Sequence, residues 1–425
     1  MTKNEHGKKP LLTYISVVGN NHERKKYACF LYYQYFGALV HREANALMER
    51  GFNVDIICLR NSYEEPKITH IDGHTLYQIQ SRPAAEKSTA SYFLNLSLFF
   101  VKSLFLVSWL HIRKRYRLIQ VFAPPDIMVF AAIIPRILGS KLILVIHDIG
   151  PELFMRKLGL GEKHVIIRVI KLLERMSIRF THHVITVTDP WKDRLVGRSV
   201  SSSKCTVVLN VPDERIFKFN PSQIERKDDT AINLFYHGSM EEHFGVDTML
   251  EAMPLIRKQV PNAMLNIYCG KRGRMLDNFL VLVNKLGIDN CVIFNNYVPF
   301  NKLPGVLSSA DIGLVPTKGG VFSNEAVSMK SLEYMFLGIP IVISGTKAHR
   351  YYYDDSFVTF FNPGDVSDFA DKVVGICKDT RRRKMQVQNS RLFIEKHSWE
   401  QTKKIYYSAI QIVFNNSDFL KNQDY

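Results

Sequence analysis

The sequence alternates short runs of β-branched and aliphatic residues with longer helical patterns, and it does so twice along its 425 residues. Strands joined by helices in this way are typical of parallel, doubly wound sheets. A chain of this length also exceeds what one compact core usually holds. The sequence therefore predicts an α/β protein with two tandem Rossmann-like domains. The expected strands cover residues 12–18, 54–59, 118–122, 141–146, 183–187 and 206–209 in the first half, and 232–236, 264–268, 292–294, 312–315, 341–343 and 358–361 in the second.

A polar stretch at residues 210–230 separates the two halves and contains Pro212 and Pro221. This composition is typical of a linker. We expect an N-terminal domain at residues 1–212 and a C-terminal domain at residues 230–396. Residues 397–425 begin with an amphipathic helical pattern, and we expect them to cross back onto the N-terminal domain.

The positive charge of the chain is concentrated in its first half. The formal net charge is +16, and residues 1–200 hold 29 Lys and Arg against 16 Asp and Glu. A basic domain favours an anionic partner, which is usually nucleic acid or an anionic membrane surface. The sequence has no zinc-finger spacing and no RNP-like aromatic motif, so we expect no nucleic acid. The six cysteines are scattered, and no apolar leader segment follows the N-terminus, which predicts reduced thiols in a cytoplasmic protein.

One apolar segment, residues 92–112, is long enough to cross a bilayer and is followed by Arg113, Lys114 and Arg115. Asn95 and Lys102 interrupt it, which favours a buried helix of an α/β domain over a spanning helix. In a third interpretation the apolar face and basic end of this helix rest on an anionic membrane. The third interpretation agrees best with the charge asymmetry.

Three groups of candidate residues follow predicted strands, where parallel sheets place functional side chains. His147 and Asp148 follow the strand at 141–146, and a neutral imidazole there can donate or accept a hydrogen bond. In the second half, Gly238 and Ser239 follow the strand at 232–236, and the glycine allows a ligand to approach the backbone closely. Lys271 and Arg272 follow the next strand and would suit a diphosphate.

Two glutamates, Glu325 and Glu333, stand eight positions apart at the start of an apolar helical run that ends in Gly338-Ile339-Pro340. On a helix this spacing places both near one face. The helix N-terminus offers free N–H groups to a phosphate, and carboxylates can accept hydrogen bonds from sugar hydroxyls. The sequence contains no P-loop and no G-x-G-x-x-G after the first strand, which disfavours a P-loop NTPase and a simple dehydrogenase. It also contains no D-x-D triplet, so we expect no metal clamp.

Together these positions resemble glycosyltransferase family 4, whose retaining enzymes have the two-Rossmann GT-B architecture. The resemblance covers nearly the whole chain. Its carriers are His147-Asp148 with Pro151-Glu152, Asn210-Val211-Pro212-Asp213, Tyr236-His237-Gly238-Ser239, Ala310-Asp311-Ile312-Gly313-Leu314-Val315-Pro316, Glu325 and Glu333 with Tyr334-Met335 and Gly338-Ile339-Pro340, and His397-Ser398-Trp399-Glu400.

The resemblance implies roles for several residues. Glu325 would contact the hydroxyls of the donor sugar, and Glu333 the ribose of the nucleotide. The backbone at Val327 and Ser328 would hold diphosphate oxygens, and His147 would lie near the reacting sugar. The family needs no metal or cofactor and retains the anomeric configuration by front-face attack, with the leaving phosphate taking the proton of the acceptor.

The sequence departs from the family at two diphosphate-binding places. Members of the family carry an Arg just after the glycine at 238 and a Lys shortly afterwards, where this chain has Ser239 and Phe244. We expect Lys330, between the two glutamates, to supply the missing cation. His243, Lys271 and Arg272 are the other candidates.

The resemblance implies a glycosyltransferase that moves a sugar from a nucleotide-sugar donor to a lipid-linked or polysaccharide acceptor. Its basic N-terminal domain would take the acceptor and face an anionic membrane, and its C-terminal domain would bind the donor. We expect a cytoplasmic enzyme, peripheral at the inner face of the membrane. Two alternatives stay open: a catalytically impaired sugar-nucleotide-binding scaffold, because of Ser239 and Phe244, and a nucleotide-sugar epimerase with the same architecture.

Overall fold

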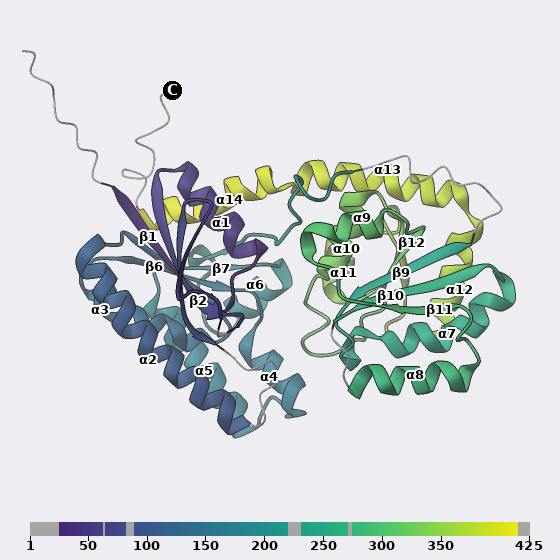
Figure 1. Cartoon of the computed structure of the whole chain (residues 1–425), viewed down its shortest axis with the longest axis horizontal. Helices are drawn as coiled ribbons and strands as arrows, with labels where there is room; N and C mark the ends of the chain where they lie inside the picture. The colour runs from purple at the N-terminus through teal and green to yellow at the C-terminus, as the bar shows by residue number, and fades with distance from the viewer. Residues whose placement is uncertain (1–24, 63, 82–88, 220–230, 271–273, 415–425) are drawn as a thin grey trace, which may run out of the picture.

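The chain contains two separate, mostly parallel sheets, which confirms the expected pair of Rossmann-like domains (Figure 1). The computed structural model describes residues 25–62, 64–81, 89–219, 231–270 and 274–414. The first sheet has the order β3-β4-β2-β1-β5-β6-β7-β8, and the second β11-β10-β9-β12-β13-β14. The described strands all pair in parallel except β3 and β4, which form an antiparallel edge.

The strands of the first sheet are β1 (Lys26–Tyr35), β2 (Phe52–Arg60), β3 (Ile68–Ile71), β4 (His74–Ser81), β5 (Leu118–Ala123), β6 (Lys141–Ile146), β7 (His183–Thr186) and β8 (Cys205–Val207). Those of the second are β9 (Ile232–Gly238), β10 (Ala263–Cys269), β11 (Val292–Asn295), β12 (Ile312–Val315), β13 (Ile341–Ser344) and β14 (Thr359–Phe361). Every residue of β5 is buried, as the continuous apolar run of a central parallel strand predicts.

Three strands of the first sheet were not predicted. The strand expected at 12–18 lies outside the described residues, and the central strand is instead β1, whose sequence KYACFLYYQY is rich in aromatic residues. Aromatic residues favour strands as β-branched ones do, so a signal for β1 was present. The edge strands β3 and β4 alternate polar and apolar residues, a weaker pattern.

Helices cover both faces of the first sheet (Figure 1). Apolar residues of α2, η1 and α5 pack with one face of the sheet, and those of α1 and α14 with the other. The helices before the linker are α1 (Ala38–Glu49), α2 (Thr89–Lys114), α3 (Ile133–Ile137), α4 (Gly150–Leu158), α5 (Val165–Phe180) and α6 (Asp189–Val196), with 3₁₀ helices η1 (Asp126–Ala132) and η2 (Ser202–Lys204).

The second half contains α7 (Val246–Gln259), α8 (Arg274–Leu286), α9 (Leu303–Leu307), α10 (Met329–Leu337), α11 (Lys347–Tyr352), α12 (Val366–Lys378), α13 (Thr380–His397) and α14 (Trp399–Phe414), with 3₁₀ helices η4 (Glu242–Phe244) and η5 (Phe300–Lys302). The last helix, α14, lies on the first domain. Trp399 stacks under the Arg42 guanidinium at 4.2 Å, and the Tyr407 hydroxyl donates to the Ala46 carbonyl at 2.8 Å.

A histidine of α11 carries a pH-dependent part of the stability. His349 is fully buried, and burial lowers the pKa of its imidazole to about 4. The unfolded chain therefore binds more protons than the folded one between about pH 4 and 6.5, so stability from His349 is present above pH 6.5 and is lost as the pH falls. Between pH 6 and pH 4.5, we expect wild type to lose about 1.4 kcal/mol per pH unit more than His349→Gln. Urea unfolding at several pH values measures this, and parallel stability profiles would contradict it.

Candidate functional site

Two adjoining cavities lie where the strands of both sheets end. The interdomain cavity, of about 300 Å³, is lined by residues of both domains, including His147, Asp148 and Val327. The C-terminal cavity, of about 500 Å³, is lined by Gly238, Lys330 and Glu333 among others. Met329 lines both cavities, so the first turn of α10 separates them.

The helix that carries Glu333 starts later than the sequence indicates. α10 begins at Met329 with Ser328 as its N-cap, so Glu325 precedes the helix by four residues. The expectation that Glu325 and Glu333 share a helix face is therefore wrong. The physical reason is that contacts from elsewhere fix the segment before the helix: the Thr188 hydroxyl donates to the Glu325 carbonyl at 3.2 Å, and Ala348 N–H donates to the Asn324 carbonyl at 2.8 Å.

Glu333 is buried at the wall of the C-terminal cavity, with Oε2 3.2 Å from His237 Nε2. Burial raises the pKa of the Glu333 carboxyl to about 7, although Lys330 acts against the shift. Burial also lowers the pKa of His237, with the Lys330 charge as the second cause. The imidazole of His237 is therefore neutral. The Glu333 carboxyl can accept a hydrogen bond from a diol when it is ionised and donate one when it is protonated.

Lys330 projects into the same cavity and lies against Gly238. The φ angle of Gly238 is 122°, and a Cβ there would stand 3.1 Å from Lys330 Cε. The Lys330 ammonium lies 4.3 Å from the centroid of the Phe244 ring. The aromatic ring at the place where the family carries a lysine thus contacts the cation expected to replace that lysine. Burial lowers the pKa of Lys330 to about 8, with Glu333 opposing, so the ammonium is mainly charged at neutral pH.

The other predicted donor-site residues differ in position. Ser239 lines the C-terminal cavity, and its carbonyl accepts from the Tyr236 hydroxyl at 2.5 Å. Val327 lines the interdomain cavity, whereas Ser328 N–H donates to His349 Nε2 at 3.3 Å. Lys271 and Arg272 lie outside the described residues.

His243 forms a contact that the sequence did not indicate. Its Nδ1 lies 2.6 Å from Nη1 of Arg156, a residue of α4 in the other domain. Burial and the Arg156 charge lower the pKa of His243 to about 4, so this histidine is neutral at pH 7. Arg156 itself brings a cation to the loop between Ser239 and Phe244. No local motif marks it, because the contact joins residues 87 positions apart.

His147 and Asp148 follow β6 and line the interdomain cavity, as expected from their place at a strand end. Burial, with the Arg42 charge, lowers the pKa of His147 to about 4. Its Nε2 is buried and has no hydrogen-bond partner among the described residues. A neutral imidazole nitrogen in this position is available to a ligand.

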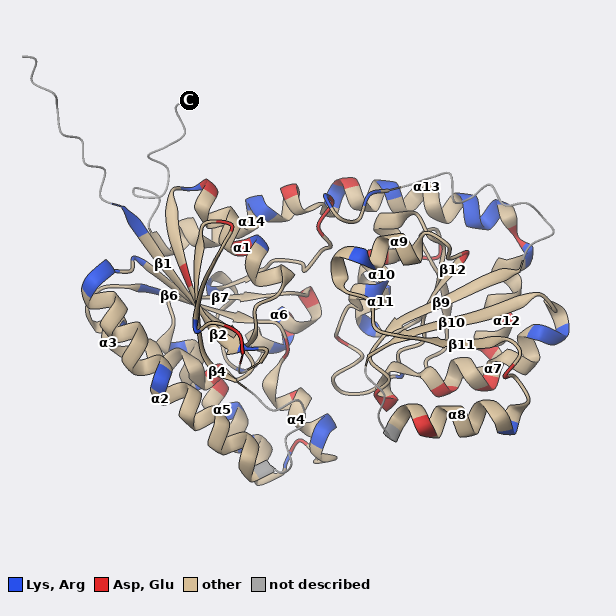
Figure 2. Ribbon diagram, in the orientation of Figure 1, with Lys and Arg blue, Asp and Glu red and all other residues tan. Residues whose placement is uncertain are grey.

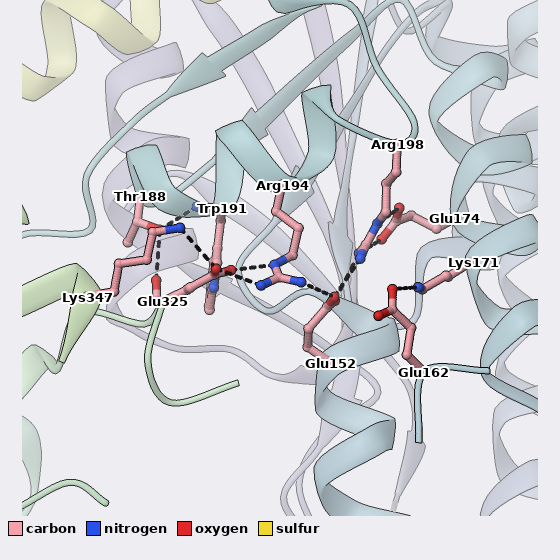
Figure 3. Close-up of polar contacts among 10 residues, drawn as sticks. All are labelled: Glu152, Glu162, Lys171, Glu174, Thr188, Trp191, Arg194, Arg198, Glu325 and Lys347. Carbon is pink, nitrogen blue, oxygen red and sulfur yellow. Dashed lines mark hydrogen bonds and ion pairs between the residues drawn. The ribbon is translucent and has the colours of Figure 1, made fainter. Parts of the chain in front are cut away.

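Glu325 is bound by Arg194 of α6 (Figure 3). Arg194 Nε and Nη2 donate to the two carboxylate oxygens at 2.5 and 2.6 Å, and Lys347 Nζ lies 3.3 Å from Oε1. Burial raises the pKa of Glu325, but Arg194 and then Lys347 outweigh it and the pKa is lowered. The second carboxylate of the site is therefore ionised and lies in a bridge between the two domains.

The bridge continues into the first domain as a chain of buried ion pairs (Figure 3). Arg194 Nη1 donates to Glu152 at 3.2 Å, and Glu152 also accepts from Arg198 at 2.5 and 2.9 Å. Arg198 in turn donates to Glu174 at 2.9 and 2.6 Å. Glu152 belongs to the Pro151-Glu152 sequence that carried part of the resemblance, and the structure gives it this structural role.

Two protein-family models match the chain, one in each half. The model described as Glycosyltransferase Family 4 matches residues 37–214, and that described as Glycosyl transferases group 1 matches residues 231–379. Together they cover most of the sequence, and they meet at the linker between the two sheets.

Among curated proteins, a GDP-mannose-dependent alpha-(1-6)-phosphatidylinositol monomannoside mannosyltransferase of Mycolicibacterium smegmatis is 30% identical over 100 residues, which is 23% of this chain and 26% of that protein. An uncharacterized glycosyltransferase of Methanocaldococcus jannaschii is 26% identical over 265 residues, 58% of this chain and 65% of that protein. The matches thus span about a quarter of the mannosyltransferase and just under two thirds of the archaeal protein.

Solved structures share the fold over nearly the whole chain. Sucrose-phosphate synthase from Thermosynechococcus elongatus superposes with a TM-score of 0.74 at 16% identity, over 92% of this chain and all of that one. WaaG, a glycosyltransferase involved in lipopolysaccharide biosynthesis, gives a TM-score of 0.63 at 17% identity over 91% and 99%. These likenesses establish the GT-B fold. With its two family matches, the chain belongs to the GT-B glycosyltransferases, as a Glycosyltransferase Family 4 domain followed by a glycosyl transferases group 1 domain.

Proposed function

We propose that the protein transfers a sugar from a nucleotide-sugar donor to a lipid-linked or polysaccharide acceptor, with retention of configuration and without a metal. The observation that supports this most is the pair of adjoining cavities, one with Lys330 and Glu333 and the other with the unpaired His147 Nε2. The similarity to a mannosyltransferase that uses GDP-mannose and phosphatidylinositol monomannoside supports both classes of substrate.

In this proposal the nucleotide diphosphate occupies the C-terminal cavity. The Glu333 carboxyl accepts from a ribose hydroxyl, and the Lys330 ammonium pairs with diphosphate oxygens. Free N–H groups of the first turn of α10 add to this grip. The sugar then reaches the interdomain cavity, where His147 Nε2 binds one of its hydroxyl groups.

The reacting acceptor hydroxyl approaches from the N-terminal domain and attacks on the face from which the phosphate leaves. The leaving phosphate oxygen takes the acceptor proton, so no side chain acts as the base. Lys330 stabilises the charge that develops on the diphosphate, which replaces the function of a metal ion. We place the enzyme in the cytoplasm, peripheral at the inner face of the membrane, because its basic domain would meet a lipid-linked acceptor there.

The scaffold alternative also has an observation in its favour. Arg194 occupies both carboxylate oxygens of Glu325, the residue that would contact the donor sugar. A donor must displace part of this bridge or bind beside it. If the bridge persists with donor bound, the protein would bind nucleotide sugars without turnover.

A donor screen followed by a product assay tests the proposal. Thermal shift across nucleotide sugars identifies the donor, because a ligand that binds only the folded state raises its stability. Transfer or hydrolysis of that donor is then measured with a chelator present, and NMR gives the anomeric configuration of the product. We expect activity in wild type and a loss in Glu325→Ala and Lys330→Ala. Full activity in both variants would overturn the site assignment, and an epimeric nucleotide sugar formed without acceptor would identify an epimerase.

A further inference from the structure

An apolar stripe runs along the outer face of α2. Leu96, Phe99, Val107 and Leu110 are buried in the core of the first domain, so one face of this helix belongs to the fold. The opposite face of the helix has an apolar residue at every third or fourth position, and these residues are exposed. It consists of Leu94, Leu98, Val101, Phe105, Trp109 and Ile112, and Leu94 and Phe105 are 72% and 70% exposed.

The helix is also long and apolar enough to cross a bilayer, and residues 90–114 are the sole such segment in the part of the chain that the structure describes. The buried face argues against a spanning helix, because inserting α2 would remove its side chains from the core. The exposed face argues equally against the buried helix favoured at first from the sequence. What remains is a core helix with a second, unpartnered apolar face.

A second stripe lies on α5, which packs with α2 around η1 on the same face of the sheet (Figure 1). Val165, Val169, Leu172 and Met176 are all about half exposed or more and are spaced as one helix face. Exposed cations alternate with them, namely Arg168, Arg175 and Arg179. An exposed apolar face this extended is unusual on a soluble monomer.

A basic cavity of about 520 Å³ adjoins the C-terminal end of the α2 stripe. Its cationic lining residues are Arg115, Arg117 and Lys141, and the described lining residues include no carboxylate. Two exposed apolar residues, Ile112 and Leu138, also line it, so the cavity opens beside the stripe. It lies at the amino-terminal edge of β5 and β6, the edge opposite the candidate site.

The positive charge extends along this edge of the sheet. Burial, with Lys141, Arg136 and Lys204, lowers the pKa of His182 to about 4. Each of these three positive side chains disfavours the charged form of the imidazole and so lowers its pKa. α2 itself contains no acidic residue (Figure 2). The apolar face therefore ends at a basic rim.

We propose that the outer face of α2 and α5 docks on an anionic membrane, and that the cavity of Arg115, Arg117 and Lys141 binds the phosphate headgroup of a lipid in that membrane. The combination selects this occupant: apolar side chains enter the acyl region, and cations beside them meet the phosphates. A soluble phosphate needs no apolar stripe. If a second copy of this chain bound here instead, the basic rims of the two copies would repel each other.

This inference deepens the proposed function, since it names the lipid surface that would carry the acceptor. The docking face lies along the helices, with the interdomain cavity at one end of the sheet and the basic cavity at the other. Docking does not depend on catalysis, so vesicle binding and donor binding can be measured independently.

Cosedimentation of the full chain with vesicles tests the proposal. We expect binding to phosphatidylcholine vesicles that contain phosphatidylglycerol, and little to phosphatidylcholine alone. Arg115→Ser with Lys141→Ser should weaken partitioning about 25-fold, at about fivefold per cation. Phe105→Ser should weaken it about tenfold, through lost apolar burial. The matched controls lie on α13 of the other domain. The double variant Arg381→Ser with Lys384→Ser and the single variant Leu392→Ser should both bind vesicles as wild type does.

Three results would overturn the proposal: equal binding to both kinds of vesicle, stabilisation by inorganic phosphate without vesicle binding, or a dimer in light scattering that Phe105→Ser dissociates and that binds no vesicles. The thermal shift with a nucleotide sugar is measured on the same proteins. Vesicle binding without that shift would leave this inference standing and refute the proposed function. A thermal shift with a nucleotide sugar but no vesicle binding would refute this inference and leave the proposed function standing.

Discussion

Replacing Lys330 with methionine should abolish most nucleotide-sugar binding and transfer. Methionine keeps the approximate length and removes the cation that lies against Gly238 in the C-terminal cavity. A charge-assisted bond to phosphate contributes about 1.5–3 kcal/mol, so we expect donor affinity to fall about 10- to 100-fold. The effect should be large because Ser239 and Phe244 stand where the family carries Arg and Lys. Calorimetric titration with the donor found by the screen measures it.

The control for this variant is Lys384→Met, which removes an exposed lysine of α13. Wild-type affinity in the control and unchanged affinity in Lys330→Met would together show that another residue carries the diphosphate. Arg156 would then be the next candidate, because it reaches His243, the neighbour of Phe244, from the first domain.

The pKa of Lys330 gives the same assignment a second signature. Since burial lowers this pKa to about 8, the free protein loses the ammonium charge as the pH rises through about 8. Donor affinity should therefore fall above pH 8 in wild type and stay nearly constant in Lys330→Met.

Replacing Arg198 with alanine should cause the largest loss of stability. Its guanidinium binds Glu152 and Glu174, each only 1% exposed, and its own side chain is 12% exposed. Removal takes the cation from Glu174 and leaves Glu152 with Arg194 alone, and breaking a buried pair costs about 3–5 kcal/mol. We expect the unfolding midpoint to fall by about 10 °C. Calorimetry or thermal circular dichroism measures this.

Two further variants separate charge pairing from packing. Arg168→Ala removes an exposed arginine of α5 and should change stability by less than about 0.5 kcal/mol. Arg198→Ala combined with Glu174→Gln should recover part of the loss, because it removes the carboxylate that Arg198 had paired, whereas Arg194 still pairs with Glu152. A midpoint for Arg198→Ala equal to that of Arg168→Ala would show that the ion pairs contribute nothing net.

The sequence predicted the second sheet well, because each of its strands lies in a short, mainly apolar run between polar or glycine-containing segments. β12 coincides with the expected range 312–315. β1 was missed because it contains no valine or isoleucine and is rich in tyrosine. The residues at which helices begin were harder to predict. Because α10 begins only at Met329, Glu325 lies before the helix and not in it.

The candidate site was predictable where it depends on the ends of strands and hidden where it depends on the other domain. His147, Gly238 and Glu333 line the cavities because strands and one helix place them there. The partners of Glu325 and His243 are Arg194 and Arg156, which lie 131 and 87 positions away. Such contacts follow from how the two domains meet, which no local pattern records.

The most direct test of the account is donor binding to wild type and to Glu333→Gln, measured with the nucleoside diphosphate and with the complete nucleotide sugar. The account predicts that wild type binds both and that Glu333→Gln binds both more weakly by a similar factor, because Glu333 contacts the ribose that the two ligands share. It also predicts that Glu325→Ala weakens only the nucleotide sugar. Equal affinity of all three proteins for both ligands would contradict the assignment of this cavity to the donor.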